Sequence, residues 1–255
     1  MLKLESLTKK FGGLAAVQDI SVSFEKGKIN AIIGPNGAGK TTLFNLIGGV
    51  FQPTSGRILF NGEDVTRLRT NQIAQLGVAR TFQSTNLFDR ATVLDNLIVG
   101  HRLRTRSGLV DVLLGTRRLK DEEQICREKA RAALEFVGLS RMANRVAGDI
   151  SQEERKRVAF ALALTTDPLL LLLDEPAGGV NPEETAGIAE LIRKMCDSGL
   201  TVCLVEHKMN MIMNLADKIL VLNYGEKIAE GTPAEIGSNP TVIDAYLGSA
   251  HAAAR

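Results

Sequence analysis

The sequence predicts an α/β fold in which a parallel β-sheet core is combined with an N-terminal antiparallel β layer and an inserted helical segment. Three observations predict it. A glycine-rich phosphate-binding motif at residues 34–42 lies between an apolar, strand-like run at 29–33 and a helix-like run that begins at Lys40. Helical segments and apolar strands alternate from residue 150 onward, as in parallel sheets. Between about 92 and 140 the apolar spacing is that of helices.

The first 30 residues predict the antiparallel β layer. Short runs at 2–5 and 20–24 alternate apolar and polar side chains, a pattern typical of half-buried strands. A hairpin is predicted within 57–66, because Asn61-Gly62 is a strong two-residue turn signal. The layer is therefore expected to lead into the phosphate-binding motif and to gain a hairpin after it.

Residues 34–42 read Gly-Pro-Asn-Gly-Ala-Gly-Lys-Thr-Thr and fit the pattern G-x-x-x-x-G-K-[ST]. Glycines let backbone N–H groups turn inward around a polyphosphate, and the following helix N-terminus adds partial positive charge. Lys40 can reach the β- and γ-phosphates, and the Thr41 hydroxyl can coordinate Mg²⁺. With glycine at about 7% of residues, the four fixed positions co-occur by chance in roughly one chain in a hundred of this size. The motif predicts that the chain binds a nucleoside triphosphate through Asn36, Gly37, Ala38, Gly39, Lys40, Thr41 and Thr42.

The helical segment shows apolar residues on one face of each of two predicted helices. These residues are Val93, Leu94, Leu97 and Ile98 in the first, and Ala130, Ala133, Leu134 and Val137 in the second. The stretch 102–120 between them is basic and interrupted by glycine, so we interpret it as a solvated connector.

A second chemical feature follows the apolar run 169–173, which predicts a buried parallel strand. The run ends in Asp174 and Glu175, and the carboxyl ends of parallel strands face the ligand side of such sheets. Asp174 is therefore predicted to help hold Mg²⁺, and Glu175 to orient and polarise the attacking water.

Composition is that of an ordinary globular protein, with 255 residues, 24% of them charged and 44% apolar. The net charge of +2 gives no electrostatic reason to expect a nucleic-acid partner. No apolar run approaches the length of a membrane span, and the N-terminus predicts no signal peptide. Three cysteines without metal-site spacing are typical of a reducing cytosol: Cys126, Cys196 and Cys203. Any membrane role is therefore expected to be peripheral, through a partner.

Together, the phosphate motif and the Asp-Glu strand end resemble the ATPase subunit of an ATP-binding cassette (ABC) transporter. The resemblance implies a P-loop NTPase (RecA-like) core and an ATP hydrolase with ATP and Mg²⁺ as its nucleotide and metal. It also implies one ABC domain over 1–255, with the core and β subdomain at about 1–88 and 150–255 and a helical subdomain at about 89–149.

The same resemblance assigns roles to three further residues. Gln83, in the run Ala79-Arg80-Thr81-Phe82-Gln83, is similar to the family glutamine that senses Mg²⁺ and water and couples the helical lobe to a membrane partner. His207 follows the apolar strand at 200–205 and is similar to the switch histidine that contacts the γ-phosphate. Phe11, before Gly12-Gly13, is similar to the aromatic residue that stacks on adenine; its alternative is a core phenylalanine.

The chain departs from the family at its signature sequence, Leu-Ser-Gly-Gly-Gln, which opens a helix before the Asp-Glu strand. Here Ser151 and Gln152 are followed by Glu153 in place of the second glycine, and by Glu154. In the family this segment acts in trans, on the γ-phosphate held by the opposite subunit. A Glu153 carboxylate about 6 Å from that phosphate would repel it by roughly 3 kcal/mol per charge pair at an effective dielectric near 20.

A local explanation is equally available for these acids. Ser151-x-x-Glu154 is a capping box, and acidic residues favour the first helical turn. Both interpretations can hold together, with a well-started helix whose anion-binding role is weakened. Asn181, where many family members carry aspartate, is likewise interpreted as a helix cap before Pro182.

The hypothesis that follows is one of asymmetric sites. This chain has all the residues expected for its own nucleotide site: the phosphate motif, Asp174, Glu175 and His207. The signature segment that would act on the nucleotide of the opposite subunit is defective. A heterodimer with a second, different ATPase subunit keeps one good site, whereas a homodimer has two compromised ones. The resemblance implies two integral membrane permease subunits as further partners and, indirectly, a periplasmic or extracellular solute-binding protein. It places the chain peripherally at the cytoplasmic face of the inner membrane.

Subfamily features extend over residues 1–248. The run Phe11-Gly12-Gly13-Leu14-Ala15-Ala16-Val17 and the ending 242–248 are similar to high-affinity branched-chain amino acid importers, where two different ATPase subunits pair. Related ATPases serve urea, other amides or lipopolysaccharide export, so these solutes remain alternatives. A soluble, non-transport ABC ATPase would be expected to carry tandem cassettes or basic extensions. A non-hydrolysing regulator would be expected to lose Glu175 or His207.

Overall fold

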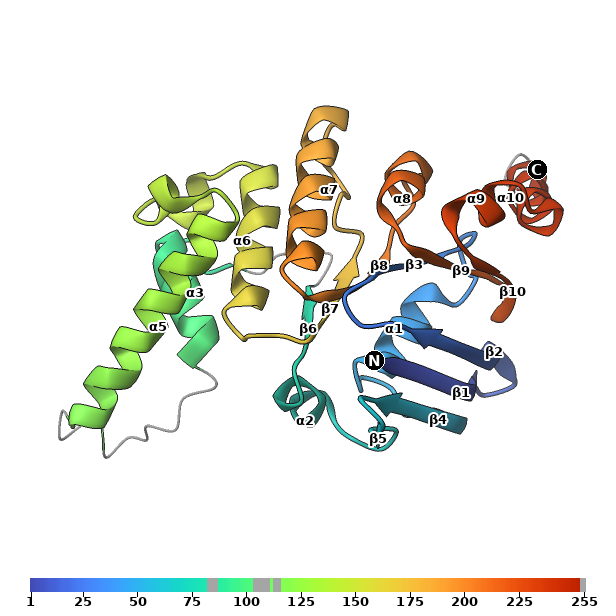
Figure 1. Cartoon of the computed structure of the whole chain (residues 1–255), viewed down its shortest axis with the longest axis horizontal. Helices are drawn as coiled ribbons and strands as arrows, with labels where there is room; N and C mark the ends of the chain where they lie inside the picture. The colour runs from blue at the N-terminus through green and yellow to red at the C-terminus, as the bar shows by residue number, and fades with distance from the viewer. Residues whose placement is uncertain (82–86, 103–110, 112–115, 253–255) are drawn as a thin grey trace. The chain divides into compact units, whose positions relative to one another are not determined.

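The computed structural model describes residues 1–81, 87–102, 111 and 116–252 (Figure 1). The chain forms two compact units, which are described separately. The first contains Met1–Arg80 and Leu169–Arg255, and the second contains Thr81–Pro168.

A six-stranded sheet forms the centre of the first unit, with strand order β10-β9-β3-β8-β7-β6 (Figure 1). Strands β7, β8, β3 and β9 pair in parallel, and β10 runs antiparallel to β9. The central strands are buried along their whole length, as the uniformly apolar runs predicted. The strands are β3 (Ile29–Ile33), β6 (Val78–Thr81), β7 (Leu170–Asp174), β8 (Thr201–Val205), β9 (Lys218–Asn223) and β10 (Glu226–Gly231).

The predicted antiparallel layer is confirmed as a four-stranded sheet with the order β2-β1-β4-β5. The predicted turn at Asn61-Gly62 joins β4 to β5, and Asn61 has the positive φ of 52° that such turns require. Strands β1 and β2 are longer than the sequence runs suggested. The strands are β1 (Leu2–Phe11), β2 (Leu14–Phe24), β4 (Ser55–Phe60) and β5 (Glu63–Asp64).

Helices of the first unit include α1, which begins at Lys40 as the phosphate motif predicted. Helix α7 begins at Pro182 behind the Asn181 cap: Asn181 Oδ1 accepts from Glu184 N at 2.9 Å, and the Glu184 carboxylate accepts from Asn181 N at 3.0 Å. The helices are α1 (Lys40–Ile47), α2 (Thr70–Gln75), α7 (Pro182–Asp197), α8 (Met209–Leu215), α9 (Pro233–Gly237) and α10 (Pro240–Ala252).

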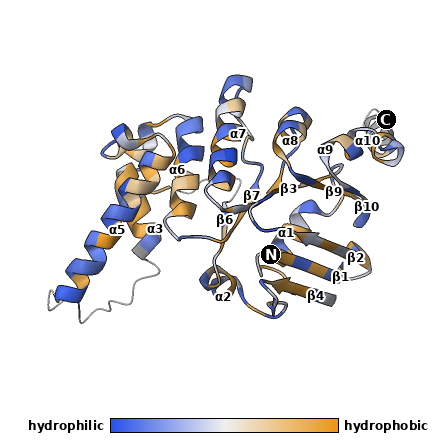
Figure 2. Cartoon of the chain, in the orientation of Figure 1, coloured by the Kyte–Doolittle hydropathy of each residue, from blue (hydrophilic) through white to orange (hydrophobic). Residues whose placement is uncertain are grey.

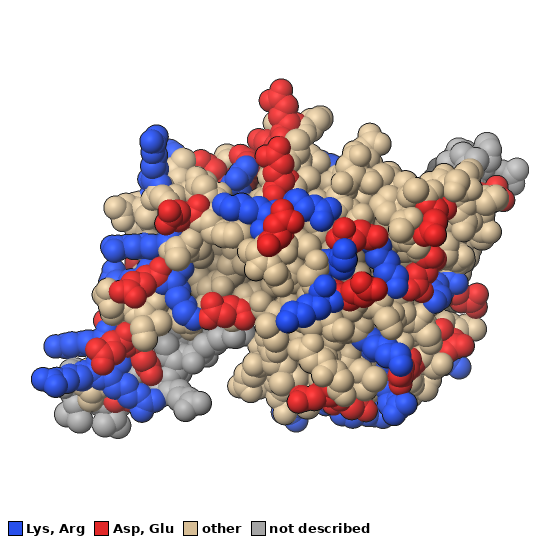
Figure 3. Space-filling view, viewed as in Figure 1, with Lys and Arg blue, Asp and Glu red and all other residues tan. Residues whose placement is uncertain are grey.

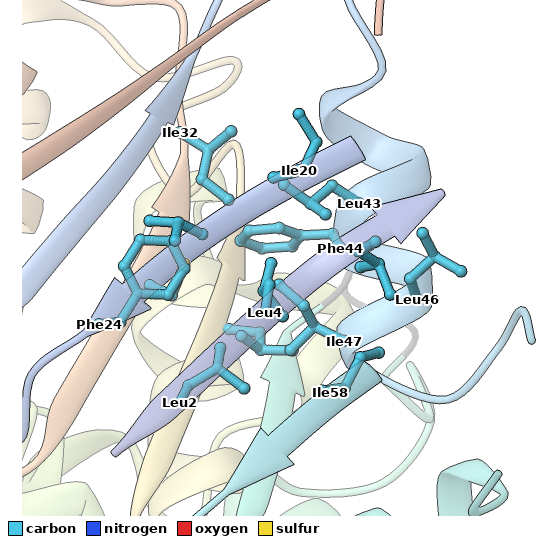
Figure 4. Close-up of a cluster of buried hydrophobic side chains, with 14 of the residues drawn as sticks. Leu2, Leu4, Ile20, Phe24, Ile32, Leu43, Phe44, Leu46, Ile47 and Ile58 are labelled. Atoms are coloured by element: carbon cyan, nitrogen blue, oxygen red, sulfur yellow. The ribbon is translucent and has the colours of Figure 1, made fainter. Parts of the chain in front are cut away.

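One hydrophobic cluster joins α1 to both sheets (Figure 4). Leu43 and Phe44 on α1 are fully buried together with Leu4 of β1, Ile58 of β4 and Ile32 of β3. Burying one such side chain stabilises the fold by about 1.5–3 kcal/mol. The helix that follows the phosphate motif is therefore anchored by its apolar face.

The described residues of the second unit include the helices α3 (Val93–Arg102), α5 (Arg117–Phe136) and α6 (Gln152–Leu164), and the short 3₁₀ turns Ser140–Met142 and Ala147–Asp149. The apolar residues predicted to share helix faces are buried, and Figure 2 shows the apolar and polar faces of α5. Helix α3 packs closely on α6, since a Cβ at Gly100 would lie 2.1 Å from Leu162 Cδ1. This unit is wider than the predicted helical subdomain at about 89–149, because α6 packs on α3 and α5.

Among the described residues, no helix combines the length and apolar character needed to cross a membrane.

Two leucines of the β1–β2 hairpin provide a test of the core. Leu4 is 1% exposed within the cluster and Leu14 is 71% exposed. We expect Leu4→Ala to lower the free energy of unfolding by about 2–5 kcal/mol, because it removes buried methyl groups and leaves a cavity. Leu14→Ala should change it by no more than about 0.5 kcal/mol. Urea unfolding of both variants measures the difference, and equal losses would contradict this assignment of the core.

Candidate functional site

Three strand ends meet at one edge of the six-stranded sheet. The register pairs Ile32 of β3 with Val205 of β8, and Val205 with Asp174 of β7. The phosphate loop that follows β3, the acidic pair at the end of β7 and the His207 segment after β8 therefore leave the sheet side by side. Such an edge is where open α/β sheets bind ligands.

The phosphate loop depends on two glycines that pack against backbone. Gly34 has φ 151°, and a Cβ there would lie 2.1 Å from Leu222 O of β9. Gly39 has φ 98°, and a Cβ there would lie 2.3 Å from Ala16 O of β2. Only glycine fits both the backbone conformation and the space at these positions. The loop is thus held between β9 and the start of β2.

Lys40 lies across this loop with its side chain directed back toward it. The residue is 6% exposed, and its Nζ donates to Gly34 O at 2.7 Å and to Pro35 O at 2.9 Å. Burial lowers the pKa of the Lys40 ammonium, and the nearby carboxylates Glu175 and Asp174 partly oppose that shift. The group is a buried cation that faces two acids and is well placed to exchange carbonyl contacts for phosphate oxygens.

Asp174 is held by one oxygen only. Its Oδ2 pairs with Arg80 at 3.0 Å, and Arg80 also donates to Asn45 Oδ1 on α1 at 2.6 Å. Its Oδ1 is buried and makes no hydrogen bond within the part of the chain that the structure describes. A buried carboxylate oxygen without a donor, near a helix that begins Lys40-Thr41, fits a hard cation such as Mg²⁺, which takes oxygen ligands.

Glu175 and His207 are in direct contact: His207 Nε2 lies 3.1 Å from Glu175 Oε1. Glu175 has a left-handed backbone with φ 48°, and its N–H donates to Val205 O at 2.9 Å. A non-glycine residue in this region is strained by about 1–3 kcal/mol, and such strain is concentrated at functional sites. The turn directs the Glu175 carboxylate toward the histidine.

Phe11 lies at the end of β1, in the hairpin whose second strand contacts Gly39 through Ala16. It is 44% exposed, which argues against the core alternative. Its ring packs edge-on against Phe51 with centroids 5.3 Å apart, and Lys9 Nζ lies 5.0 Å from its centroid. The ring is thus partly exposed at the tip of a hairpin whose second strand contacts the phosphate loop.

The signature segment lies in the second unit. Ser151 caps α6, with Oγ accepting from Glu154 N at 3.2 Å and the Glu154 carboxylate accepting from Ser151 N at 2.7 Å, so the predicted capping box is confirmed. Gln152 is the first residue of the helix. The Glu153 side chain is turned along the helix, where its Oε1 accepts from Arg157 Nε at 2.6 Å. Gln83 lies outside the described residues.

Three residues at this site were not assigned a role from sequence. Arg80 donates to Asp174. Glu206 accepts hydrogen bonds from the backbone N–H groups of Ala177 and His207. Burial raises the pKa of Tyr246, whose hydroxyl is hydrogen-bonded to the Gly34 backbone. Glu206 carries a signal, since it is a charged residue directly after an apolar strand, as Asp174 is. The sequence around Arg80 and Tyr246 gives no comparable signal, because the residues that they contact are distant in sequence.

Comparison with known proteins places this geometry in a family. Residues 17–178 match the family described as ABC transporter. Residues 226–252, which include β10, α9 and α10, match the family described as branched-chain amino acid ATP-binding cassette transporter.

Curated relatives match nearly the whole chain. The high-affinity branched-chain amino acid transport ATP-binding protein BraF of Pseudomonas aeruginosa is 41% identical over 98% of both chains. The protein of the same description named LivG from Escherichia coli is 40% identical over 98% of both. The probable LivG of Archaeoglobus fulgidus is 36% identical over 98% of this chain and 96% of its own.

Solved structures agree with the sequence matches. A nucleotide-free ATP-binding cassette from an ABC transporter superposes with a TM-score of 0.85 and 34% identity, over 96% of this chain and 98% of that one. The ADP conformation of an ABC transporter cassette gives a TM-score of 0.86 and 34% identity, over 97% and 98%. The predicted fold class is thereby confirmed, and the chain belongs to the ABC transporter family as an ATP-binding cassette.

Proposed function

We propose that this chain hydrolyses MgATP at the ends of β3, β7 and β8 and thereby powers an importer of branched-chain amino acids. The observation that carries hydrolysis is the 3.1 Å contact between Glu175 Oε1 and His207 Nε2, next to the buried cation of Lys40. The solute class is supported by the names of relatives that are 40–41% identical over 98% of the chain.

In this proposal each side chain has one task. Lys40 exchanges its contacts with Gly34 O and Pro35 O for charge-assisted bonds to the β- and γ-phosphates. Glu175 accepts the proton of the attacking water as general base, and His207 holds the γ-phosphate in line with it. Thr41 and Asp174, with Gln83, would hold Mg²⁺, which neutralises charge on the phosphate oxygens.

The other residues of the phosphate loop are proposed to bind the nucleotide without taking part in the reaction. Backbone N–H groups of Asn36, Gly37, Ala38, Gly39 and Thr42 are proposed to surround the phosphates beside the N-terminus of α1, which favours anions. The Ala38 N–H donates to Pro35 O at 3.2 Å and would exchange that contact for a phosphate oxygen. Phe11 is proposed to stack on the adenine ring, where stacking on one aromatic face contributes about 1–3 kcal/mol per base.

Replacing the proposed general base separates hydrolysis from binding. We expect Glu175→Gln to lower the rate of ATP hydrolysis by about 10²–10⁴-fold, since the amide cannot take up a proton. The affinity for a fluorescent ATP analogue should change little, because Lys40 and the loop are intact. Phosphate release and fluorescence titration measure the two quantities. Glu183→Gln, an exposed acid in the first turn of α7, is the matched control and should leave both unchanged.

The metal requirement can be tested at Asp174. Chelation of Mg²⁺ should abolish hydrolysis by the native protein. We expect Asp174→Asn to raise the Mg²⁺ concentration for half-maximal hydrolysis by about tenfold or more, because an amide oxygen carries no charge to attract the cation. Asp197→Asn, an exposed residue at the end of α7, is the control. An unchanged Mg²⁺ dependence would remove Asp174 from the metal site; unfolding is measured alongside, since Arg80 loses its ion pair.

We further propose that this chain pairs, across the bound nucleotide, with a second, different ATPase subunit. Ser151, Gln152 and Glu153 form the segment that this family presents to the opposite site, and Glu153 brings a negative charge there. The Arg157 contact at 2.6 Å balances part of that charge, so roughly 3 kcal/mol is an upper bound on the repulsion of each phosphate charge at about 6 Å. The loss of glycine also prevents close backbone approach.

Sedimentation of the Glu175→Gln protein with and without MgATP tests this pairing, because blocked hydrolysis traps any ATP-bound dimer. We expect the chain to bind ATP and remain monomeric. Adding Glu153→Gly should restore ATP-dependent dimerisation, whereas Glu183→Gly, at the equivalent position of α7, should not. An ATP-dependent dimer of the Glu175→Gln protein alone would favour a homodimeric transporter instead.

The remaining partners are proposed from the same relatives. Two integral membrane permeases would hold this subunit peripherally at the cytoplasmic face of the inner membrane, and a periplasmic or extracellular solute-binding protein would deliver the solute. Figure 3 shows Lys and Arg interspersed with Asp and Glu over the face that it draws, so no nucleic-acid partner is proposed. Screening the cognate solute-binding protein with leucine and with urea separates the branched-chain proposal from amide transport.

A further inference from the structure

Glu206 is a buried carboxylate between β8 and His207. It is 3% exposed, yet it forms no ion pair with a lysine or arginine among the described residues. Its charge is instead met by backbone donors. Oε2 accepts from Ala177 N at 3.1 Å, and Oε1 accepts from His207 N at 3.1 Å and from Lys208 N at 3.3 Å.

These donors come from two different loops. Ala177 belongs to the loop between β7 and α7, which begins with Glu175, and His207 and Lys208 belong to the loop between β8 and α8. A buried carboxylate is stable only when its oxygens are hydrogen-bonded, and bonds to an ionised acceptor are the stronger kind. Because the buried Glu206 carboxylate needs these donors, it joins the two loops.

Lys208 connects its own loop to the end of the β7–α7 loop and to the first turn of α7. Its Nζ donates to Val180 O at 2.9 Å and to Thr185 Oγ1 at 2.7 Å. The Glu175 N–H bond to Val205 O is a further connection. The contact between Glu175 and His207 thus lies between loops that are joined at three places.

We propose that Glu206 is a positioning residue for ATP hydrolysis, which holds the Glu175 loop in register with His207. The inference rests on the proposed function, since it requires Glu175 and His207 to act on the same phosphate. Glu206 does not touch substrate. It acts through the backbone of both loops, and a displacement of about 1 Å at such a pair can cost about 10²-fold in rate.

The test is Glu206→Gln in the assembled transporter. The amide keeps the size of the side chain but loses the charge, and its NH₂ group cannot accept the N–H donors. We expect the hydrolysis rate to fall about tenfold to hundredfold. The affinity for fluorescent ATP should stay within about twofold, because the Lys40 loop lies on a different strand. Glu235→Gln, whose carboxylate also accepts a backbone N–H but caps α9, should retain the native rate.

A second background distinguishes positioning from a general structural role. In the His207→Ala protein, the side chain that Glu206 would position is absent. Adding Glu206→Gln should therefore lower the hydrolysis rate by less than about threefold more. An equal loss in both backgrounds would overturn the inference, as would a native rate for Glu206→Gln. If Glu206→Gln fails to fold, Lys208→Met removes a second of the three connections. It should give a smaller fall in the hydrolysis rate at the same ATP affinity, and a native rate for Lys208→Met would then overturn the inference. Absence of hydrolysis by the native transporter would refute the proposed function itself.

Discussion

The parallel register of β3, β8 and β7 is the constraint on which the rest of the site depends. Because Ile32, Val205 and Asp174 are aligned across the sheet, three loops from distant parts of the sequence begin at the same level. A shift of one strand by one residue would turn its inward side chains outward and displace its loop by about 3.3 Å. All three strands are buried along their whole length, which makes such a shift costly, so the precision of the site derives from the core.

Charge at this edge is organised by pairing each buried ion with a different kind of partner. Lys40 rests on two carbonyl oxygens, Asp174 on the guanidinium of Arg80, and Glu206 on backbone N–H groups. The first partnership is the easiest to exchange, because a carbonyl is a weaker acceptor for an ammonium than a phosphate is. The Asp174–Arg80 pair joins the end of β7 to β6, and Glu206 joins two loops. The edge therefore combines one exchangeable cation with two structural ion contacts.

Sequence predicted most of the fold and part of the site, and the division has a physical reason. The phosphate motif, the apolar strands and the Asn61-Gly62 turn encode local backbone geometry, so they could be recognised without knowledge of contacts. Capping boxes at Ser151 and Asn181 were predicted for the same reason, since both partners lie three residues apart. The ion pair of Glu153 with Arg157, the bond of Tyr246 to Gly34 and the role of Arg80 were missed. Arg80 and Tyr246 bind partners that only the folded chain brings near, and the Glu153 pair is one of several possible surface pairings on its helix.

The position of β3 in the sheet also governs how the chain can fold. Both of its neighbours come from late in the sequence, because Ile29 pairs with Val202 and Asn30 with Lys218. On a ribosome, the strand that carries the phosphate loop would emerge long before either neighbour and would wait with both edges unpaired. Unpaired apolar strands are prone to aggregate, and sheets with distant pairings fold slowly. The first unit is therefore expected to acquire its native sheet only after β8 and β9 have been synthesised, and the phosphate loop should reach its native conformation only then.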